Sequence, residues 1–274
     1  MEISAFGFLL GLLLLALPVY ICLAFDLRLL KRFGMSLLRM ALAIGALAVL
    51  VGFLIRYDRV WLNIAAALAL ALVSAAASVM RSGLSHRRLL LPVMAAAVIP
   101  IFVLGPYMLL LVLSINTPFS ARTIIPLTVL TTAPASALVA RALRTYYIGL
   151  EHHGQLYRYL LGNGATHHEA VRHFMRRAFQ TCLLPAMGRM KYLLISGAPV
   201  LMLALVMSGV GVWTAAVMEI FLTLAVVVYV VSTFWLAVLL SRRYTFDAYE
   251  RLRPMKHLAP DTSSDTSDVT PSDL

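Results

Sequence analysis

Gly-Asn-Gly-Ala-Thr-His-His-Glu-Ala-Val-Arg-His-Phe-Met-Arg-Arg-Ala-Phe-Gln, residues 162–180, is a polar stretch in an otherwise apolar chain. Thr166 stands three residues before Glu169, which is the spacing of a capping box. In that motif the threonine hydroxyl accepts a hydrogen bond from the glutamate N–H, and the carboxylate reaches back to the threonine. Gly162 and Gly164 interrupt any helix before it. The stretch therefore predicts a helix that begins after Thr166.

The predicted helix is amphipathic and basic. Apolar residues recur at helical spacing at Ala170, Val171, Phe174, Met175, Ala178 and Cys182. Arg172, Arg176 and Gln180 share another face. A capped basic helix between membrane spans is typical of a docking element along the membrane surface. The residues that we predict for docking are Gly162, Gly164, Ala165, Thr166, Glu169, Arg172, Arg176 and Arg177. The pattern is equally consistent with arginines that bind lipid headgroups.

The composition indicates an integral membrane protein. Hydrophobic residues make up 61% of the 274 residues and charged residues only 13%, whereas a soluble domain carries about 25% charged residues. The net charge of +11 would suit nucleic acid, but the basic residues stand at the ends of apolar segments, where lipid and topology rules act. We therefore expect a lipid bilayer as partner and no nucleic acid.

Seven apolar runs are predicted to cross the bilayer, and the first has the length of about 20 residues that a spanning helix needs. The first lacks a preceding basic segment, so we expect a retained span rather than a cleaved signal peptide. Prolines in the fourth and fifth runs could hide a broken or re-entrant element. The predicted spans are Phe6–Phe25, Leu37–Ile55, Val60–Met80, Leu89 to about Ser114, Thr123–Ala140, Tyr192–Met207 and Val212–Leu240.

The resulting fold class is all-α, a polytopic membrane protein with about seven transmembrane helices. We expect a membrane domain over residues 1–258, with a cytoplasmic coupling region at 141–191 and a disordered polar tail at 259–274. Twenty of the 23 Lys and Arg residues fall on one side of this topology. The positive-inside rule then places the N-terminus outside and the C-terminus in the cytoplasm, in the inner (plasma) membrane.

The chain has no phosphate-binding GxxxxGK[ST] loop and no HExxH, GxSxG or paired-carboxylate motif. We therefore expect that the chain is not an enzyme by itself and holds no cofactor of its own. His167, His168 and His173 fit either a metal site or a solvated polar face. The methionines near the last two spans fit either soft-metal ligation or helix packing. A metal site is thus left open.

Glu219 is the one carboxylate well inside a predicted span, about 10 Å from its outer end at 1.5 Å per residue. An intramembrane carboxylate is costly and often functional. It either faces a transport path or reaches outward or to a neighbouring Ser or Thr, and we expect the sixth span to face it. The residues that we predict along a path are Glu219, Met202, Pro199, Thr131 and Thr132.

Several motifs in order resemble the FetB-type permeases, membrane subunits of ABC transporters linked to bacterial iron export and related to plant aluminium-tolerance permeases. They cover most of the chain except the tail. An Ile-Pro pair opens the fifth span and Gly154-Gln155 follows in the cytoplasmic region. Then come Leu-Gly-x-Gly-Ala-Thr at 161–166, Arg-Arg-Ala at 176–178, Leu184-Pro185, Lys191, Pro199 and Gly209.

The resemblance implies that the helix after Gly164 contacts a separate ATP-binding subunit, which holds the ATP and magnesium. It implies a homodimer with two such subunits and export of a metal, iron in the family. The membrane path departs from the family pattern, because Ala133-Pro134 replaces Gly-Asn and Glu219 replaces a Gln. A secondary transporter or channel that uses Glu219 is the alternative, and a membrane scaffold without transport is a third.

Overall fold

The computed structural model describes residues 20, 30–84, 86–112, 118–194 and 199–245. The chain forms two compact units, Met1–Tyr57 and Asp58–Leu274, and each is described by itself. The first unit contains α3, Leu30–Tyr57, whose residues Phe33–Tyr57 are long and apolar enough to span a membrane. The predicted first span and the tail lie outside the described residues.

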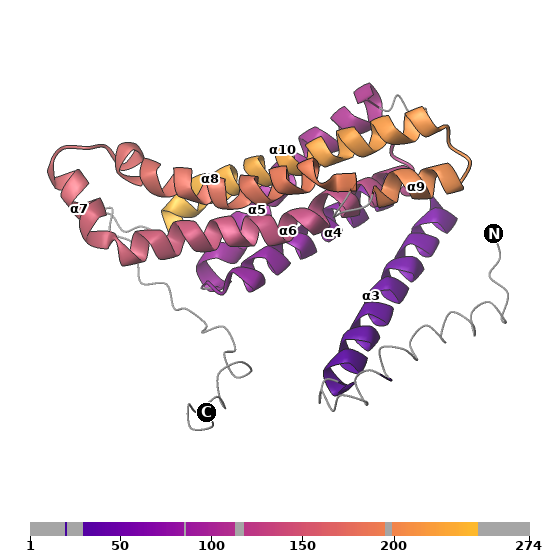
Figure 1. Cartoon of the computed structure of the whole chain (residues 1–274), viewed down its shortest axis with the longest axis horizontal. Coiled ribbons are helices and arrows are strands. Elements are labelled where there is room, and N and C mark those ends of the chain that lie inside the picture. Colours follow the sequence, from indigo (N-terminus) through magenta and orange to yellow (C-terminus); the bar gives the residue numbers. More distant parts are fainter. Residues whose placement is uncertain (1–19, 21–29, 85, 113–117, 195–198, 246–274) are drawn as a thin grey trace, which may run out of the picture. The chain divides into compact units, whose positions relative to one another are not determined.

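The second unit is a bundle of helices that run side by side (Figure 1). Its described part contains no strand, which confirms the all-α prediction. In chain order the elements are α4 (Val60–Ser82), α5 (His86–Pro106), the π-helix η1 (Tyr107–Val112), α6 (Ala121–His152), α7 (Gly154–Gly162), α8 (His167–Lys191), α9 (Val200–Met207) and α10 (Val212–Thr245).

Five helices of the described residues are long and apolar enough to cross a membrane. They correspond to five of the predicted spans, and the protein is a multi-pass membrane protein. The fourth of the predicted spans is an α-helix that passes Pro92 and Pro100 and continues after Pro106 as η1. The predicted sixth span is described only in part, and its described helix is α9, with 8 residues.

α6 extends further than the sequence predicts. The predicted fifth span ends at Ala140, but the helix continues to His152 because Ala142, Leu143, Tyr146 and Tyr147 bury their side chains. α6 packs against α4, α8 and α10. The twelve extra residues add about 18 Å at 1.5 Å per residue. Part of the region predicted as a polar interruption is therefore a helical extension of the bundle.

Small residues allow α4 to approach α6 closely, as expected for interfaces between membrane helices. Ala67, Ala71 and Ala75 are buried at a spacing of four residues on α4. Ser74 donates a hydrogen bond to the Thr132 carbonyl (2.8 Å), and the Arg81 guanidinium donates to the Ser136 hydroxyl (2.9 Å). These polar contacts fix the two helices along their length.

Asp58 ties the first residues of α4 and α6 together at the other end of the bundle. Its carboxylate accepts hydrogen bonds from the Ala121 N–H and the Asn63 side-chain amide, both at 3.0 Å. The Asn63 amide also donates to the Phe119 carbonyl at 3.1 Å. The Ala121 N–H, followed by Asn63 and the charge of Arg122, holds the pKa of Asp58 below its ordinary value.

We predict that this tie stabilises the bundle only while Asp58 is ionised. Because the pKa of the folded carboxyl lies below 3.8, its contribution is complete above that pH and is lost as pH falls through the folded pKa. The thermal stability of the wild type in detergent should thus decrease in acid. Asp58→Asn, which keeps an acceptor oxygen but has no charge, should lack this part of the pH dependence. Identical pH profiles for the two proteins would contradict the assignment.

Candidate functional site

The turn between α7 and α8 is closed by hydrogen bonds on both sides. After α7 ends at Gly162, the Gly164 N–H bonds to the Leu161 carbonyl and the Ala165 N–H to the Leu160 carbonyl, both at 3.1 Å. This is the Schellman pattern, which places a left-handed residue after the helix. Gly164 fills that position with φ of 85°. The prediction that the glycines end the preceding helix is confirmed.

α8 begins with the predicted capping box. Thr166 is the N-cap, and its hydroxyl accepts from the Glu169 N–H. The Glu169 carboxylate accepts in turn from the Thr166 N–H at 2.8 Å. Only residues 163–166 separate the two helices. Most backbone groups of this segment take part in the hydrogen bonds that cap the helix ends. We call residues 162–166, together with α7 and the first turn of α8, the α7–α8 elbow. The caps restrict the conformation of its turn.

The predicted apolar face of α8 is present, and the helix packs onto α6. Every fourth residue of α8 is buried along this contact: Ala170, Phe174, Ala178, Cys182 and Ala186. A Cβ at Gly149 would stand 3.4 Å from the Phe174 ring, so the glycine permits the close approach. Burial raises the pKa of the Cys182 thiol to about 11. Cys182 is therefore a packing residue that remains a neutral thiol.

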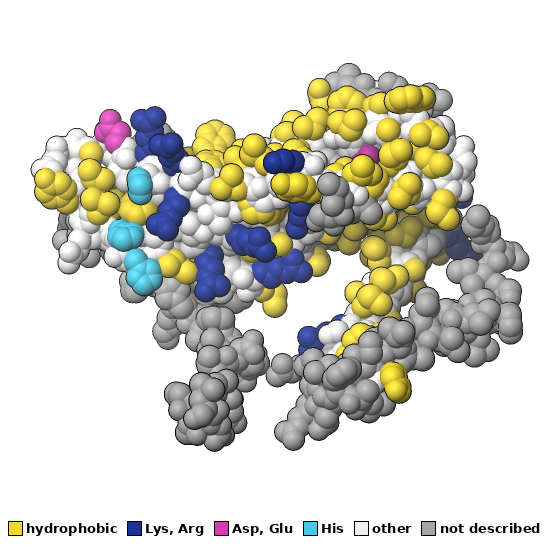
Figure 2. Space-filling model, viewed as in Figure 1, with side chains coloured by type: hydrophobic (Ala, Val, Ile, Leu, Met, Phe, Trp, Pro, Cys, Tyr) yellow, Lys and Arg dark blue, Asp and Glu magenta, His cyan; other side chains and the backbone are white. Residues whose placement is uncertain are grey.

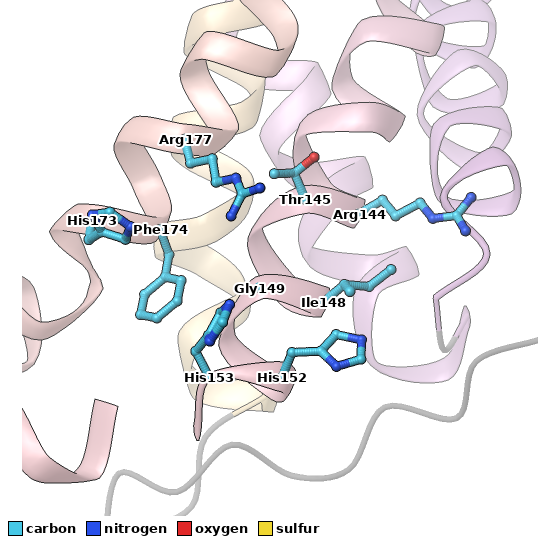
Figure 3. Close-up of a pocket in the computed structure, with 9 residues that line it drawn as sticks. All are labelled: Arg144, Thr145, Ile148, Gly149, His152, His153, His173, Phe174 and Arg177. Atoms are coloured by element: carbon cyan, nitrogen blue, oxygen red, sulfur yellow. The ribbon is translucent and has the colours of Figure 1, made fainter. Parts of the chain in front are cut away.

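A basic cleft opens beside this contact, between the end of α6 and α8. It has a volume of about 370 Å³. In Figure 3, Arg177 extends from α8 toward α6 above Gly149 and His153, and the Phe174 ring lies beside them. Arg144, His152 and His173 complete the charged and titratable lining, and no carboxylate is among the described residues that line it. Figure 2 shows histidines and basic side chains gathered over this end of the bundle.

α7 presents apolar side chains to its surroundings. Tyr157 is buried and anchors the helix in the core, but Leu156 and Tyr159 are 46% and 68% exposed. Sequence analysis did not single out these two residues or Arg144. Glycines stand at both ends of α7, at Gly154 and Gly162. This local pattern could have predicted the bounds of the short helix. The cleft has no such signal, because its residues come from segments distant in the sequence.

Glu219 and Met202, both predicted for a transport path, meet across the α9–α10 turn. The Glu219 carboxylate accepts a hydrogen bond from the Met202 N–H at 3.1 Å. Met202 is the third residue of α9, after the N-cap Pro199. The N–H groups of a first helical turn lack partners within the helix. Glu219 thus caps an apolar helix, and the expectation that the sixth span faces Glu219 is confirmed.

Thr131 and Thr132, also predicted for the path, make hydrogen bonds within their own helix. Both are buried on α6, and their hydroxyls donate to the carbonyls of Leu127 and Thr128 one turn earlier. Their place on a transport path stays a prediction. Within the described residues, no three His, Cys, Asp or Glu side chains are placed to hold a metal. The side chains of His167 and His168 lie outside that description.

We predict that Glu219 stabilises the protein as an acceptor rather than through its charge. Glu219→Ala leaves the Met202 N–H without a partner in apolar surroundings, which costs about 1–3 kcal/mol. Glu219→Gln keeps an acceptor oxygen and should lose less. Amide hydrogen exchange at Met202 and the thermal midpoint in detergent measure both effects.

Thr223→Val is the matched control, since the Thr223 hydroxyl bonds to the Glu219 carbonyl within α10. It should leave exchange at Met202 unchanged. Equal losses in Glu219→Gln and Glu219→Ala would show that the charge, and not the cap, is what matters.

Comparison with known proteins gave one match. No curated protein and no solved structure matches the chain. Residues 5–246, which include every described helix, match the uncharacterised protein family UPF0014. The chain belongs to this family of membrane proteins.

Proposed function

We propose that the chain is the permease subunit of an ABC transporter and that the α7–α8 elbow docks on a separate ATP-binding subunit. The observation that carries the proposal is the exposed apolar face of α7, with Leu156 and Tyr159, at the far end of the helical extension. Membership of a family that includes ABC-permease-like membrane proteins also supports it.

Lipid does not account for this exposed face. α7 follows α6, which extends about 18 Å past the end of its predicted span at Ala140. Apolar side chains at such a distance from hydrocarbon are in a polar environment unless a protein covers them. Exposed apolar groups rimmed by polar residues mark interaction sites. The basic cleft between the end of α6 and α8, with Arg144 and Arg177, offers a further charged surface for a partner.

The elbow is suited to transmit movement. Its caps restrict Gly164 and Thr166, so a displacement of α7 is passed to α8 rather than absorbed in the turn. α8 in turn packs along α6, which is itself a candidate span. ATP-driven closure of the partner subunits would then tilt α6 and switch the access of the transport path. ATP and magnesium belong to the partner in this proposal.

The resemblance to iron-export permeases suggests the remaining features. We propose a metal cation, with iron as the first to test, as exported cargo. We also propose a homodimer in the inner membrane, with the N-terminus outside and the elbow in the cytoplasm. Uptake of iron(II) into inverted vesicles that contain the complex, dependent on ATP, measures the cargo. Transport without added nucleotide would favour a secondary transporter instead.

We predict that Leu156→Ala combined with Tyr159→Ala weakens the assembly with the ATP-binding subunit by at least tenfold, the effect of about 1.4 kcal/mol. The loss follows because both side chains bury apolar area in the interface. Affinity co-purification of the tagged chain with its P-loop ATPase, followed by ATPase assay, measures it. Cysteines at Ala165 or Thr166 should crosslink to that subunit.

Gln180→Ala, on the exposed face of α8 away from the elbow, is the control and should assemble normally. Gly164→Pro should keep membrane insertion but separate ATP hydrolysis from transport, since it disrupts the left-handed turn. Normal assembly of the Leu156–Tyr159 double variant, together with absent crosslinks in a purified complex, would refute docking through the elbow.

A further inference from the structure

A second groove lies on the other side of α8, between this helix, α6 and α10. Its volume is about 740 Å³, twice that of the basic cleft. Phe179 of α8 and Trp235 and Leu239 of α10 give it an apolar floor. Arg172 and Arg176 of α8 and Arg242 of α10 line it as well. The groove is thus amphipathic, apolar along one part and cationic along another.

The charge of the groove is positive. Three guanidinium groups line it, with His173 beside them, and Glu169 is the one carboxylate among the described lining residues. The Glu169 carboxylate already accepts hydrogen bonds from the Thr166 N–H and hydroxyl, both at 2.8 Å. Its charge is held at the α8 N-terminus, where the helix dipole favours it. The lining therefore carries more cationic than anionic side chains, which suits an anion.

The groove lies at the end of the predicted seventh span, Val212–Leu240. Between Val212 and Leu240, α10 carries Glu219 as its one charged residue. Trp235 lies 23 residues after Val212, or about 35 Å along the helix, a length comparable to the roughly 30 Å of hydrocarbon. Tryptophan is enriched at this depth. Arg242 follows about 10 Å further out. A lipid of the adjoining leaflet can therefore reach the groove without leaving the membrane.

We propose that this groove binds an anionic phospholipid. Its phosphate contacts the arginines, and its glycerol and upper acyl chain lie along Trp235 and Leu239. A free phosphate compound would use the arginines but leave the apolar floor uncovered. A zwitterionic lipid would bring an ammonium group next to the guanidinium groups. Arg172 and Arg176 thus bind a membrane lipid in this proposal, whereas Arg177 lines the basic cleft.

Trp235 can report on binding directly. The chain has 3 tryptophans, and Trp61 and Trp213 stand near the first residues of α4 and α10, at the other end of the bundle. A Trp61→Phe, Trp213→Phe protein leaves Trp235 as the single emitter. It is reconstituted into vesicles that mix unlabelled zwitterionic phospholipid with anionic or zwitterionic phospholipid brominated near the glycerol end. Bromine quenches tryptophan at short range.

We expect the anionic lipid to quench Trp235 at a lower mole fraction than the zwitterionic lipid, by about fivefold for each arginine engaged. Arg176→Gln and Arg242→Gln should each reduce that preference by a similar factor. Arg177→Gln, an exposed arginine on the same helix, is the matched control and should keep the full preference. Unchanged size-exclusion profiles confirm that the variants are folded.

Four results would overturn the proposal. Equal quenching by both lipids would show that the groove does not select charge. An equal loss in Arg177→Gln would show a general surface potential rather than a site. Absence of quenching by either lipid would show that protein fills the groove. Soluble glycerol phosphate should fail to restore Trp235 emission in anionic vesicles, and restoration would assign the arginines to free phosphate instead.

Discussion

The packing of α8 onto α6 is the contact on which the end of the bundle near α7 depends. α8 runs back along α6 because small residues at every fourth position, such as Ala170 and Ala178, let the helices approach. Gly149 of α6 lies against the Phe174 ring of α8 within this contact. This one contact separates two depressions, a basic cleft toward the end of α6 and an amphipathic groove toward α10. Loss of the contact would remove both.

Helix ends impose the second constraint, because each leaves backbone groups without partners within the helix. The chain satisfies them in different ways according to their surroundings. At the α7–α8 elbow, near water, Gly164 and Thr166 supply local caps. In the apolar part, a side chain from another helix, Glu219, caps α9. Placing a carboxylate inside the membrane costs free energy. That cost is offset because the Met202 N–H would otherwise have no hydrogen-bond partner in hydrocarbon.

The sequence predicts those features that depend on neighbours in the chain. The capping box at Thr166 and the apolar face of α8 follow from spacing alone, and the structure confirms both. The length of α6 was underpredicted because Arg141 and Arg144 are typical of a span that ends at the membrane surface. In the structure Tyr146 and Tyr147 are buried by α8 and α10, and the Tyr147 hydroxyl bonds to Ser241. Such contacts join distant residues, and no local pattern reveals them.

The arginines of α8 show why a basic helical face is ambiguous in sequence and specific in structure. Successive residues of a helix point about 100° apart, so Arg176 and Arg177 leave α8 in different directions. Arg176 lines a groove with the tryptophan and leucine of α10, whereas Arg177 lines a cleft with histidines and the end of α6. The same residue type therefore meets an apolar neighbour on one side and polar neighbours on the other. A lipid phosphate carries an apolar chain and suits the first setting. A protein surface suits the second, because that cleft is lined by arginines and histidines and by no residue of α10.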